Sequence, residues 1–217
     1  MPVALDCETG GLAPTDPVHV VSLYDSRSGK ASSFVSSGKC EAHLIRAIDA
    51  CEMCDQLVTF NGTAFDFRLI AHHVQQRDAR RACMLAIRSY DVLLDFAVCN
   101  GYRSSLESFA TATLNESKSM DGATAVAMWD AGEHTKVREY CEHDAAITCK
   151  LFEHGKRWGR LWRHTAKGRR VVWALRPGGM RTAAAAIADW TRAPADQSWM
   201  DDPPRVADAA DWTLDYL

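Results

Sequence analysis

The chain has 217 residues, of which 47% are hydrophobic and 24% charged, a composition that suits one globular domain with a sizeable core. No apolar run approaches the roughly 20 residues of a membrane span, and acids at Asp6 and Glu8 interrupt any secretory leader. The net charge of -3 argues against a surface that clamps nucleic acid all over. We therefore expect a cytoplasmic protein with no membrane partner, whose eight cysteines are reduced thiols.

The hydrophobic pattern alternates between two kinds of element. Short apolar stretches bounded by turn residues predict strands at 2–8, 19–25, 31–37 and 56–60, with a hairpin joining the second and third. Helical periodicity predicts helices at 40–54, 64–76, 105–114, 123–132 and 134–161, while residues 89–97 begin extended and turn helical. A strand at 169–175 and a helix at 181–193 follow, and the remainder is predicted to be loop or disorder. This order predicts an α/β fold.

The C-terminal part of the chain changes its sign of charge. Residues 154–188 contain no acid, and their basic residues are Lys156, Arg157, Arg160, Arg163, Lys167, Arg169, Arg170, Arg176 and Arg181. Three tryptophans lie in the same run, Trp158, Trp162 and Trp173, and an acidic tail follows it. Arginine and tryptophan together suit a surface that tracks a nucleic-acid strand. Alternatively, the tryptophans pack this segment onto the core and the arginines are solvated.

One group of cysteine and histidine residues has the chemistry of a zinc site, namely Cys40, His43, Cys51 and Cys54. On a single helix, with a rise of about 1.5 Å per residue, Cys40 and Cys54 would stand about 21 Å apart, which is too far for one ion. We therefore interpret these residues as part of an apolar core stripe, and zinc is the less favoured alternative.

A set of acids is more informative. Asp6 and Glu8 end the first predicted strand, and because residues i and i+2 of a strand share a face, both carboxylates converge on one point. Asp66 opens a helix that follows a strand, a place where α/β sheets gather ligand groups. Tyr140 and Asp144 are four apart on a predicted helix and share one of its faces. The four acids can meet.

Four carboxylates buried together need cations, because like charges raise one another's pKa and destabilise the fold. Ligand sets made only of oxygen suit Mg²⁺ or Mn²⁺. Two such ions about 3.5 to 4 Å apart are a known device for in-line attack on a phosphodiester. The acids therefore predict two Mg²⁺ or Mn²⁺ ions as cofactors.

The motifs DCETGGL, NGTAFDFRLI and YCEHD, in this order, resemble the three exonuclease motifs of the DEDD 3′-5′ exonucleases, a ribonuclease H-like group that includes DnaQ-like proofreading domains. The resemblance spans residues 3 to about 152, and Tyr140, four residues before Asp144, resembles the tyrosine (DEDDy) branch. It implies a ribonuclease H-like fold over residues 1–155, with a central mixed five-stranded sheet flanked by helices, and a C-terminal extension at 156–217.

The resemblance also implies an activity and its residues. The chain would release nucleoside 5′-monophosphates from the 3′ end of single-stranded DNA or RNA, with a replication or repair protein as a further partner. The metal ligands would be Asp6, Glu8, Asp66 and Asp144, and Tyr140 would orient and help deprotonate the attacking water. Substrate contacts would come from Thr9, Gly10, Gly11, Leu12 and Asn61, although the two glycines also suit a plain turn after the strand. Phe65 is expected in the core.

Two other functions remain open on the residues alone. A non-catalytic module of the same fold could use the acidic cleft to hold nucleic acid or protein. An acid/base hydrolase such as a glycosidase could use Asp6 and Glu8 without metal, but this leaves Asp66, Tyr140 and Asp144 unexplained.

Overall fold

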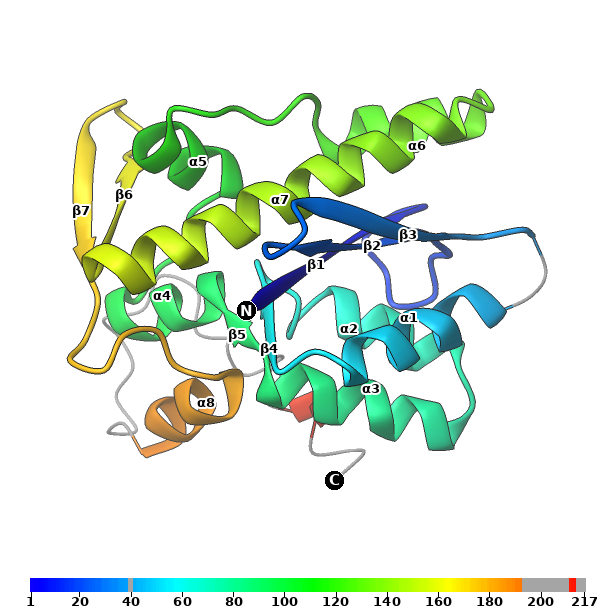
Figure 1. Ribbon diagram of the computed structural model, residues 1–217, viewed down its shortest axis with the longest axis horizontal. Coiled ribbons are helices and arrows are strands. Elements are labelled where there is room, and N and C mark those ends of the chain that lie inside the picture. The colour runs from blue at the N-terminus through cyan, green and yellow to red at the C-terminus, as the bar shows by residue number, and fades with distance from the viewer. Residues whose placement is uncertain (39–40, 193–210, 214–217) are drawn as a thin grey trace.

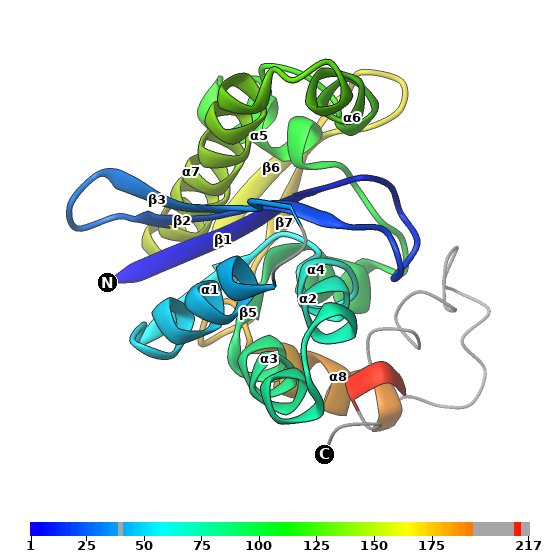
Figure 2. The same cartoon turned by 90° about the vertical axis from the view of Figure 1, so that its right-hand side faces the viewer.

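The computed structural model describes residues 1–38, 41–192 and 211–213. Its centre is a sheet with the strand order β3-β2-β1-β4-β5, and helices cover both faces (Figures 1 and 2). The strands are β1 (Pro2–Thr9), β2 (Val18–Asp25), β3 (Lys30–Val35), β4 (Gln56–Thr59) and β5 (Tyr90–Asp91). The pairs β1–β2 and β2–β3 are antiparallel, whereas β1–β4 and β4–β5 are parallel. The mixed five-stranded sheet confirms the predicted fold class.

Strand β1 separates two hydrophobic cores by the alternation of its side chains. Leu5 and Cys7 pack into the core beneath α1 (Ala42–Glu52), α2 (Asp66–His73) and α3 (Gln76–Arg88). Ala4 points the other way, into the core beneath the long helix α7 (His134–Trp158). Because side chains two apart share a face of the sheet, Asp6 and Glu8 lie on the same side as Ala4. The alternation of β1 thus directs both carboxylates toward α7.

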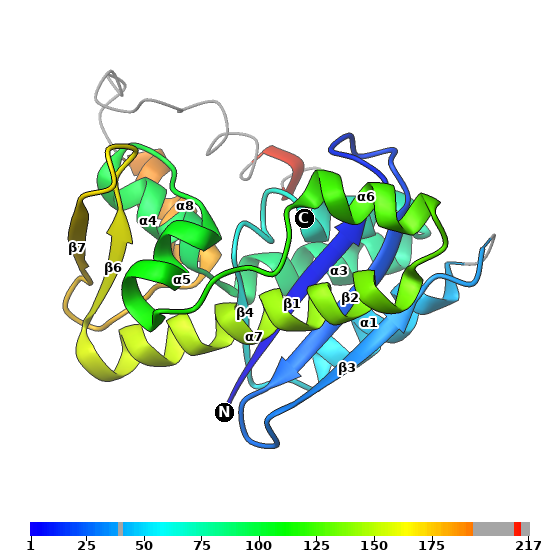
Figure 3. The same ribbon diagram turned by 90° about the horizontal axis from the view of Figure 1, so that it is seen from above.

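Three shorter helices begin with a side-chain cap. The helices are α4 (Val92–Asn100), α5 (Leu106–Leu114) and α6 (Gly122–Asp130), and their caps are Asp91, Ser105 and Asp121. Each cap accepts a hydrogen bond from the backbone N–H three residues later, which satisfies a donor that has no partner within the helix. The connection from α5 to α6 runs along α7 toward the end of β1 (Figure 3).

The segment after α7 packs closely onto the rest of the molecule. Gly159 ends α7 with a φ of +63°, and a hairpin of β6 (Arg160–His164) and β7 (Arg170–Ala174) then lies beside α5 (Figure 3). Helix α8 (Ala183–Arg192) packs its alanines against α4. Residues 193–210 and 214–217 lie outside the described residues; they include the last residue of the helix predicted at 181–193 and most of the segment predicted as loop or disorder. Residues 211–213 form a helical turn instead, and the buried Trp212 Nε1 donates to Thr63 O at 2.7 Å.

Two differences from the sequence prediction change the order of the elements. The helix predicted at 64–76 ends at His73, because Val74 and Gln75 are extended, and the helix α3 that follows was not predicted. No glycine or proline marks this break, so the periodicity runs across it. Strand β6 begins inside the helix predicted at 134–161, because the left-handed Gly159 stops α7 at Trp158.

The cysteine and histidine group takes part in packing. His43 and Cys51 are buried on α1, with His43 Nε2 at 3.0 Å from Val18 O, as the core-stripe interpretation predicts. Cys54 Sγ donates to Ala50 O at 3.3 Å, and Cys40 lies outside the described residues. The cysteines that the structure describes are free thiols. Within the same residues, no helix has both the length and the apolar character that a membrane crossing requires.

Candidate active site

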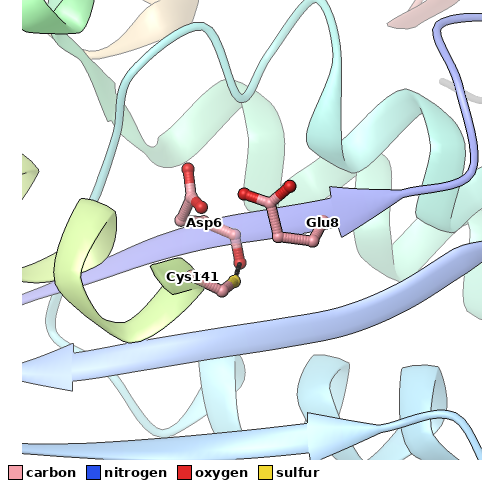
Figure 4. A group of neighbouring side chains, drawn as sticks. All are labelled: Asp6, Glu8 and Cys141. Carbon is pink, nitrogen blue, oxygen red and sulfur yellow. Dashed lines mark hydrogen bonds between the residues drawn. The ribbon is translucent and has the colours of Figure 1, made fainter. Parts of the chain in front are cut away.

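The C-terminal half of β1 presents two carboxylates side by side. Asp6 and Glu8 project to the same side of the strand, next to Cys141 of α7 (Figure 4). One ligand atom from each of these three residues lies within 4.8 Å of the other two. Cys141 Sγ donates to the backbone oxygen of Asp6 at 3.3 Å, which ties α7 to β1. Burial raises the pKa of the Cys141 thiol well above its ordinary value, so the sulfur stays protonated.

Helix α7 brings Tyr140 and Asp144 to the same place. Both lie on the buried face of the helix, where the two residues are 2% and 1% exposed, respectively. Tyr140 packs in a small cluster with Val20 of β2 and Cys141. The four-residue spacing between Tyr140 and Asp144 is one helical turn, so a single face supplies both groups.

Asp66 approaches from the opposite layer. It is the first residue of α2 and is 5% exposed, and the turn before it carries Asn61 in a left-handed conformation with a φ of +73°. The buried Asp91 holds that turn by accepting hydrogen bonds from the backbone N–H groups of Asn61 and Thr63, both at 2.9 Å. A carboxylate at the end of β5 therefore positions the segment that delivers Asp66.

A cavity of about 520 Å³ joins these elements. Its polar lining includes Asp6, Glu8, Asp66, Tyr140 and Asp144. Its apolar lining includes Phe60 and Phe65 on one side and Val126 of α6 on another. Phe65, expected in the core, packs against the core and also faces this cavity. The cavity thus combines clustered acids with aromatic and aliphatic walls, as binding sites for organic ligands commonly do.

Lys118, which the sequence motifs do not indicate, brings a positive charge to the acids. Its Nζ lies 2.6 Å from Asp144 Oδ2 and 5.2 Å from the centre of the Tyr140 ring. The connection that carries it is anchored on α7, where Glu116 accepts two hydrogen bonds from Lys150 at 2.7 and 2.9 Å and His143 Nε2 lies 3.1 Å from Ser117 O. The loop therefore holds the ammonium group over the carboxylates.

The acids are held in an environment that disfavours their charge. Burial, followed by the neighbouring carboxylates, raises the pKa of Asp6 well above its ordinary range and that of Glu8 to about 8. Burial also raises the pKa of Asp66 to about 7, although hydrogen bonds partly offset the effect. Burial raises the pKa of Asp144, and the neighbouring Lys118 partly offsets this increase. Burial and Asp144 raise the pKa of Tyr140, so its hydroxyl is protonated at neutral pH.

The donor set fits hard divalent cations. Among the described residues, Asp6 Oδ2 and Asp144 Oδ1 are buried oxygens that lack a hydrogen-bond partner. Such atoms cost free energy unless something compensates them, and carboxylate oxygens are the ligands that Mg²⁺ and Mn²⁺ prefer. Asp66 and Asp144 lie outside the group formed by Asp6, Glu8 and Cys141 but line the same cavity.

The residues after β1 line the cavity unequally. Thr9, Gly11 and Leu12 face it, and so does Asn61. Leu12 is 85% exposed, and Gly11 packs so closely on Asp16 that a Cβ would collide with that side chain. Gly10 N donates to Pro17 O at 2.9 Å in the turn and is not among the lining residues. The turn thus shapes the rim of the cavity and leaves an apolar side chain projecting from it.

The comparison with protein-family models gives one match, to the RNase H superfamily, over residues 3–156. No curated protein matches the sequence. The solved structures that match include a zinc-bound complex of E. coli exonuclease I with single-stranded DNA, with 13% identity, a TM-score of 0.42 and coverage of 72% of this chain and 40% of that one. A product-bound exonuclease I gives 14% identity, a TM-score of 0.40 and coverage of 72% and 43%.

This chain therefore spans 40% and 43% of the length of those two structures. The family match covers the whole region that contains the sheet, both flanking helical layers and the acidic cavity. The chain belongs to the RNase H superfamily.

Proposed function

We propose that this chain is a metal-dependent 3′-5′ exonuclease of the tyrosine (DEDDy) branch, which releases nucleoside 5′-monophosphates from the 3′ ends of DNA or RNA. The observation that carries the proposal is the pair of buried, unpartnered oxygens, Asp6 Oδ2 and Asp144 Oδ1, in a cavity lined by four carboxylates and a tyrosine. Residues 1–155 would form the catalytic domain and residues 156–217 an extension to it.

The carboxylates of Asp6, Glu8, Asp66 and Asp144 would hold two Mg²⁺ or Mn²⁺ ions. When bound, such ions lower the pKa of a water nucleophile and stabilise the charge that develops on the leaving 3′-oxygen. The apolar side chains that line the cavity would limit the access of bulk water and thereby strengthen the electrostatic interactions of these groups. Burial raises the pKa values of the acids, so metal binding requires the acids to release their protons.

Tyr140 would position the attacking water by donating a hydrogen bond. Its raised pKa keeps the phenol protonated, which suits a donor better than a base. This differs from the help in deprotonation that the resemblance implies. Lys118 already lies among the acids, paired with Asp144. When metal ions neutralise the acids, its ammonium group would leave Asp144 and bind the phosphate of the substrate.

The rim of the cavity would hold the terminal nucleotide. Leu12 is exposed at the entrance, where it can pack against a base, and Phe65 offers an aromatic surface in the same cavity. Asn61 Oδ1 accepts a hydrogen bond from Arg103 at 2.6 Å, which orients its amide. These contacts recognise features that DNA and RNA share, so we propose no preference between them.

The test incubates the purified chain with 5′-labelled single-stranded DNA, single-stranded RNA and recessed duplex in Mn²⁺, Mg²⁺ or EDTA. We expect a ladder that shortens by one nucleotide at a time from the 3′ end, and that EDTA abolishes. Asp6→Asn should lower the rate by about 10³-fold or more, because several kcal/mol of transition-state stabilisation depend on the metal. Asp55→Asn, which removes an exposed acid outside the cavity, is the matched control.

Two outcomes would contradict the proposal. If every substrate stays intact but one of them binds, the chain is a binding module on this fold. If cleavage continues in EDTA, metal-free acid/base hydrolysis replaces the metal-dependent mechanism.

A further inference from the structure

The hairpin of β6 and β7 is fastened to α5 by side-chain hydroxyls that pair with strand backbone. Thr113 Oγ1 accepts from Trp162 N at 2.8 Å and donates to Trp162 O at 2.7 Å. Ser108 Oγ makes the same pair of bonds with His164, at 2.9 Å from its N and 2.8 Å from its O. These four bonds satisfy backbone groups of β6 that face away from β7. The hairpin is therefore held in a fixed position relative to α5.

Aromatic packing adds to this attachment. Trp173 of β7 is 5% exposed and lies in edge contact with Phe96 and Phe109, with ring centres 5.2 and 6.1 Å away. The guanidinium carbon of Arg163 stands 4.7 Å from the centre of the Tyr102 ring, and Arg163 also donates to the Tyr102 hydroxyl. The packing of Trp173 agrees with the alternative in which the tryptophans fix this segment to the core. Arg163, by contrast, is held in one orientation near the surface.

A groove opens where the hairpin meets α5. It has a volume of about 380 Å³, and Arg103, Arg163 and His164 line it together with serines at the start of α5. A second hollow of about 610 Å³ shares Ser105 and Glu107 with this groove. The second hollow also shares Lys118 and Gly122 with the carboxylate cavity. The three hollows are thus neighbours that share lining residues, in a series from the acids, past Lys118, to the hairpin.

The charges at the hairpin groove favour an anion, because two arginines and one acid line it. Arg103 donates a hydrogen bond to Asn61 of the cavity, and Arg163 also lines the groove. The turn of the hairpin adds Lys167 and Arg169, both exposed. The acids in the second hollow have backbone partners, since Glu107 Oε2 accepts from Lys118 N at 2.7 Å and Asp121 caps α6.

We propose that this hairpin groove binds the phosphodiester backbone of a single nucleic-acid strand, several nucleotides upstream of the 3′ end that occupies the carboxylate cavity. The inference rests on the proposed function and extends it to the segment after α7. Guanidinium groups suit phosphates because their planar forks donate two parallel hydrogen bonds. A rigid groove that continues into the cavity would hold the strand in place between successive cleavages.

The test measures binding as a function of strand length in an Asp6→Asn parent, which keeps the strand intact. Fluorescence anisotropy with 5′-labelled dT3 and dT12, in Mg²⁺ and over a range of salt, gives affinities and salt slopes. We expect Arg103→Gln/Arg163→Gln to weaken dT12 binding by about 10-fold or more and dT3 binding much less. Each lost phosphate contact should also lower the salt slope by about 0.7.

Arg163 packs on Tyr102, so replacing it could also disturb folding. A second variant therefore changes residues outside this contact. Lys167→Glu/Arg169→Glu alters exposed turn residues and should reproduce the length-dependent loss. Arg77→Gln/Arg80→Gln, on the exposed surface of α3 in the opposite helical layer, is the matched control and should bind both strands as the parent does.

The outcomes separate this inference from the proposed function. If the parent binds dT12 but both hairpin variants bind it as tightly as the control does, the groove proposal is wrong and the exonuclease proposal stands. If the parent binds neither strand, both proposals are wrong.

Discussion

Buried aspartates occur in two regions of this molecule, and their surroundings differ. Asp95 of α4 is 3% exposed and accepts hydrogen bonds from Arg181 Nε at 2.6 Å and from Arg181 N at 3.3 Å. In the carboxylate cavity, by contrast, Asp6 Oδ2 and Asp144 Oδ1 have no partner among the described residues. Asp95 therefore fastens the segment before α8 to α4, whereas the cavity holds carboxyl groups whose ionisation the protein compensates only in part.

This difference indicates what each region contributes. Arg181 lowers the pKa of Asp95 and so partly offsets the effect of burial, and the pair can support the fold. The four acids of the cavity, which have Lys118 as an ammonium neighbour among the described residues, destabilise the metal-free fold and favour a divalent ion. Substitutions in either region test this difference.

The largest expected effect is on stability. Arg181→Met leaves the Asp95 carboxylate buried without its partner, which should lower the free energy of unfolding by about 3 kcal/mol or more. Urea unfolding measures the loss. Arg176→Gln, which removes a more exposed bond to Asp189, should cost less than about 1 kcal/mol. Equal losses in the two variants would contradict the proposed role of the Asp95 pair.

The next effect is on catalysis. Tyr140→Phe removes the hydroxyl beside Asp144 and should lower kcat by about 10²-fold, with little change in KM. Single-turnover cleavage of a 5′-labelled oligonucleotide measures it. A rate within threefold of the wild type would show that Tyr140 packs α7 against the sheet and does not position the water.

The smallest effect concerns Lys118. Lys118→Met removes the ammonium group that competes for Asp144, so the chain should bind Mn²⁺ about 10-fold more tightly by calorimetry, a change of about 1.4 kcal/mol. Lys136→Met, an exposed lysine of α7 that pairs with Glu133, is the control. Unchanged or weaker Mn²⁺ binding would mean that Lys118 and the metal do not compete.

The sheet and the placement of the acids could be predicted from local pattern. The alternation of β1 places Asp6 and Glu8 on one face, and the four-residue spacing on α7 places Tyr140 and Asp144 together. Asp66 was predictable because a strand and a turn precede it. Each of these inferences depends on residues close in sequence, and their catalytic roles remain predictions.

Other features depend on contacts between distant segments. Lys118 reaches the acids because Glu116 binds Lys150 and Ser117 contacts His143, pairings that no local motif specifies. The pairing of β6 with α5 through Ser108 and Thr113 is equally non-local. The break after His73 lacks a glycine or proline, so the periodic pattern could not reveal it.

The charge in the cavity also predicts how stability depends on pH. The pKa of Glu8 is about 8 in the metal-free fold, whereas its ordinary value is 4.5. Between these two values the folded chain binds more protons than the unfolded chain, so stability falls as the pH rises from about 5 to 8. The raised pKa values of Asp6, Asp66 and Asp144 act in the same direction.

The most direct test of the account is therefore thermal unfolding of the chain in EDTA and in Mn²⁺, from pH 5 to pH 8. In EDTA, Tm should fall with rising pH by about 2–4 °C for each kcal/mol lost. Mn²⁺ at 100 times Kd should stabilise the fold by about 2.7 kcal/mol and so raise Tm again. Asp6→Asn should lessen both the fall of Tm with pH and its rise with Mn²⁺. A Tm that changes neither with pH nor with Mn²⁺ would contradict the claim that these carboxylates form a divalent-metal site.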